Sequence, residues 1–152
     1  RVASRGLGDV YKRQLLNIHN ESNSSVLGVF TADPKKISNY GVIDGALDGN
    51  SYKLNNIVEK PKGEEAPSNL AVFGRYILSK EIFNHLENTS PGVNGEIQLT
   101  DAIKCLIDKD AVRAFEIMGK RFDCGSKEGY ISAIIDRSLS IEKYKDVLKN
   151  ID

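Results

Sequence analysis

The stretch Ile57-Val58-Glu59-Lys60-Pro61 joins the end of an apolar run to a carboxylate, an amine and a proline. Residues 52–58 alternate moderately between apolar and polar side chains, which predicts a β-strand that the proline ends. Glu59 and Lys60 then project from the carboxyl end of a strand, the edge at which open α/β sheets bind ligands. A lysine there neutralises phosphate, and a carboxylate accepts hydrogen bonds from sugar hydroxyls. The alternative is an ordinary solvated strand end.

Further strands and helices are predicted on both sides of this strand. Short apolar runs predict strands near residues 26–30, 40–43, 70–78 and 112–118, and helical spacing of apolar residues predicts helices near 15–20, 80–86, 97–107 and 129–148. Residues 122–125 are predicted to form a strand-to-turn corner. Strands interspersed with helices indicate an α/β layered domain, and no sequence feature marks a second compact domain.

Composition limits the classes of function. The chain has 152 residues, with 21 lysines and arginines against 21 aspartates and glutamates, so its formal net charge is zero. This balance argues against nucleic acid or a membrane surface as a partner. No apolar run reaches the roughly 20 residues of a membrane-spanning helix. Two cysteines and two histidines form no disulfide framework or zinc motif, and we expect a cytoplasmic protein.

Residues 1–14, with the sequence RVASRGLGDVYKRQ, do not resemble the rest of the chain. They carry five charges, four of them basic, and lack a sustained apolar period. We interpret them as a non-native or disordered leader that packs against nothing. Ordered structure is expected to begin at Leu15, so that residues 15–152 form one part of a domain.

Two further positions are candidates for ligand chemistry. Asp123 is followed by a glycine turn and a predicted helix, and an aspartate placed in this way can bind Mg²⁺. The alternatives are a helix cap at Ser126 or a turn stabilised by the aspartate itself. Gly41 lies between apolar strand residues, which indicates either close approach of a ligand to the backbone or a β-bulge.

Five segments taken in order resemble the bacterial UTP–glucose-1-phosphate uridylyltransferases. They are YGVID (40–44), IVEKP (57–61), APSNLAVFGRYIL (66–78), NGEIQLTDAI (94–103) and RFDCGSKEGYISA (121–133). The resemblance extends from Leu15 to about Leu148. The EKP motif recurs across sugar-nucleotide pyrophosphorylases, whereas the longer segments favour the UDP-glucose enzymes over the dTDP-glucose and ADP-glucose enzymes.

The resemblance implies a Rossmann-like nucleotidyltransferase domain built on a mixed, mostly parallel sheet. The family joins glucose 1-phosphate to UTP with Mg²⁺ as cofactor, releasing UDP-glucose and pyrophosphate, and a homo-oligomer is expected. By motif, Lys60 is the catalytic residue and contacts the sugar phosphate. Glu59 contacts the glucose hydroxyls, Gly41 offers its backbone to the sugar, and Glu96 lines the sugar pocket. Asp123 is the second of two aspartates that hold Mg²⁺.

Other parts of the family pattern do not occur in this sequence. These are the glycine-rich loop with its GTR core and downstream lysine, the uracil-contacting segment and the first magnesium aspartate. We therefore expect the chain to be the C-terminal part of an enzyme truncated at its N-terminal half, and to be inactive by itself. The alternatives are an inactive sugar-phosphate-binding or subunit-contact module, or a related dTDP- or ADP-sugar pyrophosphorylase.

Overall fold

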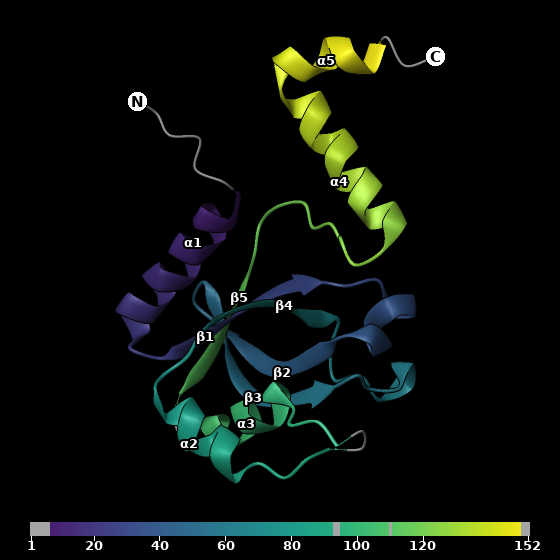
Figure 1. Ribbon diagram of the computed structural model, residues 1–152. Coiled ribbons are helices and arrows are strands. Elements are labelled where there is room, and N and C mark those ends of the chain that lie inside the picture. The colour runs from purple at the N-terminus through teal and green to yellow at the C-terminus, as the bar shows by residue number, and fades with distance from the viewer. Residues whose placement is uncertain (1–6, 93–94, 110, 150–152) are drawn as a thin grey trace. The chain divides into compact units, whose positions relative to one another are not determined.

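The computed structural model describes residues 7–92, 95–109 and 111–149, and Figure 1 labels its helices and strands. The chain divides into two compact units, residues 1–118 and residues 119–152. The sequence predicted one compact domain, because no change in composition marks a boundary near residue 118. Within the described residues, no helix is both long enough and apolar enough to cross a membrane.

The first unit contains most of the predicted elements. Its helices are α1 (Leu7–Ser22), α2 (Glu81–Asn88) and α3 (Leu99–Ile107), with short 3-10 helices at Pro34–Asn39 and Gly63–Glu65. Its strands are β1 (Ser25–Thr31), β2 (Gly41–Asp48), β3 (Ser51–Glu59), β4 (Leu70–Ile77) and β5 (Val112–Glu116). The strands are hydrogen-bonded in the order β1-β4-β2-β3-β5, and β5 pairs again with β1. The mixed α/β class is confirmed.

The direction of the strands corrects one expectation. Among the described strands, the pairs β1–β4, β2–β3, β2–β4 and β3–β5 are antiparallel, and only β1–β5 is parallel. The sheet is therefore mixed as expected, but mostly antiparallel. For the β2–β3 pair the cause is the length of the connection. Residues 49–50 alone separate β2 from β3, and so short a turn permits only an antiparallel pair, whereas the parallel partner of β1 follows a long crossover through α2 and α3.

Strand β1 is buried on both faces. Leu27 packs in the main core with Ile103 and other residues of α3, β2 and β3. Val26, whose side chain points to the opposite face, packs against Leu15 and Ile18 of α1. A central strand of this kind matches the continuous apolar run predicted from the sequence.

Helix α1 contradicts the expectation of a disordered leader over the described part of that segment. The helix begins at Leu7, and Tyr11 is 6% exposed. The Tyr11 ring meets the Phe73 ring of β4 edge to face, with 5.4 Å between the ring centroids. Tyr11, Leu15 and Ile18 occupy one helix face at spacings of four and three residues. Charged residues between these positions, such as Lys12 and Arg13, obscured the helical spacing of the apolar residues in the sequence. Residues 1–6 lie outside the described residues, and the origin of residues 1–14 stays a prediction.

The second unit consists of α4 (Lys127–Ser140) and α5 (Glu142–Lys149). The expected helix in two pieces is confirmed. The predicted strand-to-turn corner is confirmed only as a turn, since residues 122–125 contain no strand. Helix α4 carries a stripe of exposed apolar side chains: Ile131, Ile134, Ile135 and Leu139.

We predict that Tyr11→Ala lowers the free energy of unfolding by about 3 kcal/mol, because it removes a buried ring. The matched control is Leu16→Ala on the same helix, since Leu16 is 44% exposed and its truncation is expected to cost less than about 1 kcal/mol. Urea unfolding followed by circular dichroism measures both. Equal, small effects would show that residues 7–14 contribute nothing to the fold, as expected of a foreign leader.

Candidate functional site

The β2–β3 hairpin brings Gly41 and Glu59 together. Gly41 begins β2, Glu59 ends β3, and the two residues are paired across the ladder. A Cβ atom placed on Gly41 would lie 3.1 Å from Oε2 of Glu59 and 3.2 Å from Cγ2 of Thr100. The carboxylate therefore lies against the Gly41 backbone, and a larger residue would push it away. A ligand held by Glu59 is also within reach of the Gly41 main chain.

Lys60 follows directly in a strained conformation. Its φ of 45° lies in the left-handed region, which costs a residue with a side chain about 1–2 kcal/mol. The Lys60 N–H donates a 3.0 Å hydrogen bond to the carbonyl of Tyr40, which closes the open end of the hairpin. The Lys60 side chain is 65% exposed, and its Nζ lies 3.9 Å from Oε1 of Glu59. An ion pair at this distance and exposure contributes little to the stability of the fold. The Lys60 ammonium can therefore bind an anion.

Tyr76 and Thr100 join this group, and the sequence analysis did not select either residue. Burial raises the pKa of the Tyr76 hydroxyl above its ordinary value, and the negative charge of Glu59 raises that pKa further. Tyr76 is therefore a neutral hydrogen-bond donor at physiological pH. Thr100 is 8% exposed, and its hydroxyl has no hydrogen-bond partner among the described residues. Both residues lie inside segments that carry the family resemblance, but neither has a local pattern that indicates chemistry.

Glu96 does not belong to this group of residues. It is exposed in the loop before α3, and its main-chain carbonyl accepts a 2.9 Å hydrogen bond from the N–H of Gly92. In the described parts of the chain, no hydrogen bond or ion pair involves its side chain. The structure thus brings Gly41, Glu59 and Lys60 together without Glu96, whose place in the sugar pocket stays a prediction.

Asp123 belongs to the second unit and organises a turn. Its Oδ1 accepts a 3.1 Å hydrogen bond from the N–H of Gly125, and its carbonyl accepts one of 3.1 Å from the hydroxyl of Ser126. Ser126 in turn caps α4 by accepting from the N–H of Gly129 at 3.1 Å. Both structural alternatives, the stabilised turn and the cap, therefore describe the observed geometry.

A magnesium role for Asp123 is compatible with that turn. The side chain is exposed, and its Oδ2 takes no part in the turn. Groups of three or more potential metal ligands do not occur among the described residues. Mg²⁺ is commonly held by one or two carboxylates together with substrate phosphates, so a single exposed carboxylate fits as one ligand and does not form a complete site.

Glu59 and Lys60 lie at the end of a strand in a mixed α/β sheet. The sequence led us to expect this arrangement in a nucleotidyltransferase. The chain belongs to the nucleotidyl transferase family, whose model matches residues 8–138. The UTP–glucose-1-phosphate uridylyltransferase of Pseudomonas aeruginosa is 46% identical over 127 residues, which are 83% of this chain and 46% of that protein. The Haemophilus influenzae enzyme of the same name is 46% identical over 140 residues, covering 87% and 48% of the two chains.

Solved structures give the same result. A UDP-glucose pyrophosphorylase complexed with UDP-glucose superposes with a TM-score of 0.80 at 41% identity, over 85% of this chain and 49% of that one. A UTP-bound enzyme from Acinetobacter baumannii gives a TM-score of 0.78 at 37% identity, over 91% and 50%. The resemblance inferred from the five segments is confirmed. The chain spans about half the length of the curated relatives it matches.

We predict that Glu59→Gln lowers the pKa of Tyr76 towards its ordinary value, because the substitution removes the nearby negative charge. The pH titration of tyrosinate absorbance, with Tyr76→Phe to identify the transition, measures this change. Glu64→Gln, at an exposed carboxylate of the 3-10 helix Gly63–Glu65, is the control and is expected to change nothing.

The same shift has a consequence for stability. A tyrosine whose pKa is raised in the folded state contributes stability that is complete below its ordinary value of 10.0 and is lost as the pH rises through the folded value. Glu59→Gln should reduce this alkaline loss of stability. An unchanged Tyr76 titration would show that the carboxylate and the hydroxyl do not interact.

Proposed function

We propose that this chain forms the sugar-phosphate-binding part of a UTP–glucose-1-phosphate uridylyltransferase, which joins glucose 1-phosphate to UTP and releases pyrophosphate. The observation that carries the proposal is the grouping of Gly41, Glu59 and Lys60 at one end of the β2–β3 hairpin. The grouping combines an acceptor for hydroxyls with a cation for phosphate, which are the two requirements of a sugar phosphate. Relatives of that name support the choice of substrate.

Each residue has a distinct task in this proposal. The Glu59 carboxylate accepts hydrogen bonds from glucose hydroxyls while the Gly41 backbone lies against the same sugar. The neutral hydroxyl of Tyr76 is suited to donate to a sugar oxygen. Lys60, held over the strand end by its strained backbone, neutralises the sugar phosphate.

Reaction then depends on position and charge. An oxygen of the sugar phosphate forms a bond to the α-phosphorus of UTP, and the bond from that phosphorus to the leaving pyrophosphate oxygen breaks. Holding the attacking phosphate in line replaces an encounter in solution, and fixed positive charge stabilises the charge that shifts between oxygens. Lys60 supplies part of both effects.

Magnesium belongs to the proposal as a cofactor. A bound divalent ion supplies positive charge to the phosphates, and Asp123 would hold it through Oδ2 while Oδ1 keeps the turn closed. Location in the cytoplasm and assembly as a homo-oligomer are parts of the same proposal. UTP is an intracellular metabolite, which supports the location.

We predict that Lys60→Ala and Lys60→Gly both weaken glucose 1-phosphate binding at least about tenfold, because each removes a charge-assisted contact. The two variants separate binding from folding. Lys60→Gly is expected to raise the free energy of unfolding by about 1 kcal/mol, since glycine adopts a positive φ without strain. Isothermal titration calorimetry measures the affinity, and urea unfolding measures the stability.

Two controls sharpen this test. Lys62→Ala removes an exposed lysine from the adjacent loop and should leave the affinity unchanged. Glucose without phosphate should bind equally to the wild-type chain and to both Lys60 variants, whereas Glu59→Gln should weaken glucose and glucose 1-phosphate alike. A wild-type affinity of Lys60→Gly for glucose 1-phosphate would show that Lys60 does not bind the sugar phosphate.

We also predict that Asp123→Asn abolishes the strengthening of UDP-glucose binding by Mg²⁺ without lowering the melting temperature. The asparagine carbonyl still accepts from the N–H of Gly125, so the turn is kept while the charge that binds a hard cation is lost. Glu128→Gln, an exposed carboxylate on α4, is the control. The same Mg²⁺ effect in wild type and Asp123→Asn would exclude Asp123 as a ligand.

A further inference from the structure

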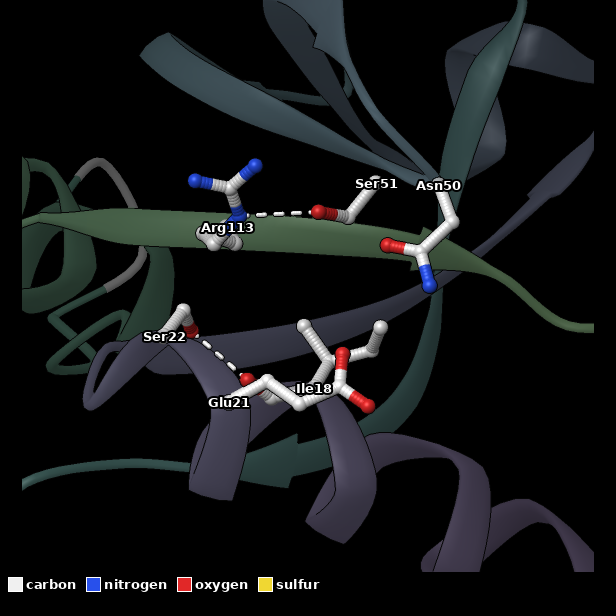
Figure 2. A pocket seen from close by; sticks show the side chains of 6 residues that line it. All are labelled: Ile18, Glu21, Ser22, Asn50, Ser51 and Arg113. Atoms are coloured by element: carbon white, nitrogen blue, oxygen red, sulfur yellow. Dashed lines mark hydrogen bonds between the residues drawn. The ribbon is translucent and has the colours of Figure 1, made fainter.

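The two ends of the β2–β3 hairpin differ in how their polar side chains are paired. At the turn end, Figure 2 shows Arg113 and Ser51 in a polar pocket, where Nε of Arg113 donates to the Ser51 hydroxyl at 2.8 Å. Nη2 of Arg113 also donates to Oδ2 of Asp48 at 2.8 Å. At the open end, beside Gly41, the hydroxyl of Thr100 is buried and has no hydrogen-bond partner among the described residues. An unpaired polar group therefore lies beside the proposed sugar-phosphate site.

Thr100 lies in the first turn of α3, which explains why its hydroxyl is unpaired. Inside a helix, a threonine hydroxyl can donate to the carbonyl three or four residues earlier. The residues just before Leu99 are not helical, so no preceding turn offers Thr100 such a carbonyl. Gln98, the N-cap residue, makes no side-chain hydrogen bond to the first turn either. The beginning of α3 is therefore suited to receive an oxygen atom of a ligand.

Thr100 and Glu59 approach the same point beside Gly41. A Cβ atom on Gly41 would lie 3.1 Å from Oε2 of Glu59 and 3.2 Å from Cγ2 of Thr100. The Thr100 methyl faces this point, while its hydroxyl oxygen, on the same Cβ atom, is buried. Rotation about the Cα–Cβ bond to another staggered position places the hydroxyl where the methyl now lies. A small side-chain rotation thus brings a hydrogen-bond donor to the side of Thr100 that faces Glu59.

The chemistry of Glu59 and Thr100 selects the ligand group that fits between them. A carboxylate only accepts hydrogen bonds, and its negative charge repels a phosphate oxygen at this place. A sugar hydroxyl both donates and accepts, so it can donate to Glu59 while it accepts from Thr100. The sugar phosphate would then direct its hydroxyls to these two residues and its phosphate to Lys60.

We propose that Thr100 determines which sugar the site accepts, by holding one sugar hydroxyl against Glu59. When the sugar phosphate binds, the Thr100 hydroxyl turns towards Gly41 and donates to the same sugar hydroxyl that donates to Glu59. Binding thereby pairs a buried hydroxyl that is unpaired in the free chain. A sugar without that hydroxyl leaves both protein groups unsatisfied, and sites of this kind reject such analogues strongly. The inference rests on the proposed binding of glucose 1-phosphate.

Two substitutions separate the hydroxyl of Thr100 from its methyl. Thr100→Val keeps the shape and loses the hydroxyl, and it should weaken glucose 1-phosphate binding about tenfold in calorimetry. Thr100→Ser keeps the hydroxyl and should bind more tightly than Thr100→Val. Because the hydroxyl is unpaired in the free chain, Thr100→Val should not lower the midpoint of urea unfolding. A lower midpoint together with unchanged affinity would show a purely structural role and overturn the proposal.

Thr89→Val is the matched control. The Thr89 hydroxyl is paired, since it donates to the carbonyl of His85 at 2.7 Å at the end of α2. Its removal should lower the urea midpoint and leave the affinity for glucose 1-phosphate unchanged, which is the opposite of the result expected for Thr100→Val.

Monodeoxy analogues of glucose 1-phosphate identify the sugar hydroxyl. The 2-deoxy, 3-deoxy, 4-deoxy and 6-deoxy compounds are each titrated into the wild-type chain and into Thr100→Val. One analogue should bind the wild-type chain at least about tenfold more weakly than glucose 1-phosphate and should bind both chains equally, because the contact is already lost. The other three should still distinguish the two chains. An equal loss of affinity in Thr100→Val for all four analogues would overturn the proposal.

The same titrations separate this inference from the proposed function. If glucose 1-phosphate does not bind the wild-type 152-residue chain, the proposed function fails, and the inference that rests on it fails as well. If the wild-type chain and Thr100→Val bind glucose 1-phosphate with equal affinity, Thr100 takes no part in sugar recognition, and only this inference is overturned.

Discussion

The pairing of β2 with β3 sets the position of the candidate site on the first unit. At one end of this ladder Gly41 lies opposite Glu59, and at the other Asp48 lies opposite Ser51. Strand side chains alternate between two faces, so a slip of one residue would turn Glu59 away from Gly41. The N–H of Lys60 continues the ladder by bonding to the carbonyl of Tyr40, which fixes the open end.

A bulge within the same ladder divides it into two registers. The register shifts between Asp44 and Gly45, so that Asn55 of β3 is the additional residue. A Cβ atom on Gly45 would lie only 2.7 Å from the carbonyl oxygen of Lys53, which explains why a glycine stands there. On each side of the bulge the strands therefore pair in a different register.

The two units depend on the sequence in different ways. In the second unit, the turn around Asp123 and the cap at Ser126 use bonds between residues two or three positions apart. Such contacts are visible in a sequence, and both were among its predicted alternatives. In the first unit, the contact of Gly41 with Thr100 joins residues far apart in the chain. No local pattern reports a contact of that range.

The sequence by itself determined the class of fold, the type of nearly every described helix and strand, and the adjacent Glu59 and Lys60. These features follow from periodicity and from neighbouring residues, which a single stretch of chain contains. Tertiary structure alone decided that the sheet is mostly antiparallel, that Tyr11 is buried, and that burial and the charge of Glu59 raise the pKa of Tyr76. The physical reason is that an apolar pattern shows which face of an element is buried, whereas its neighbour depends on the path of the whole chain.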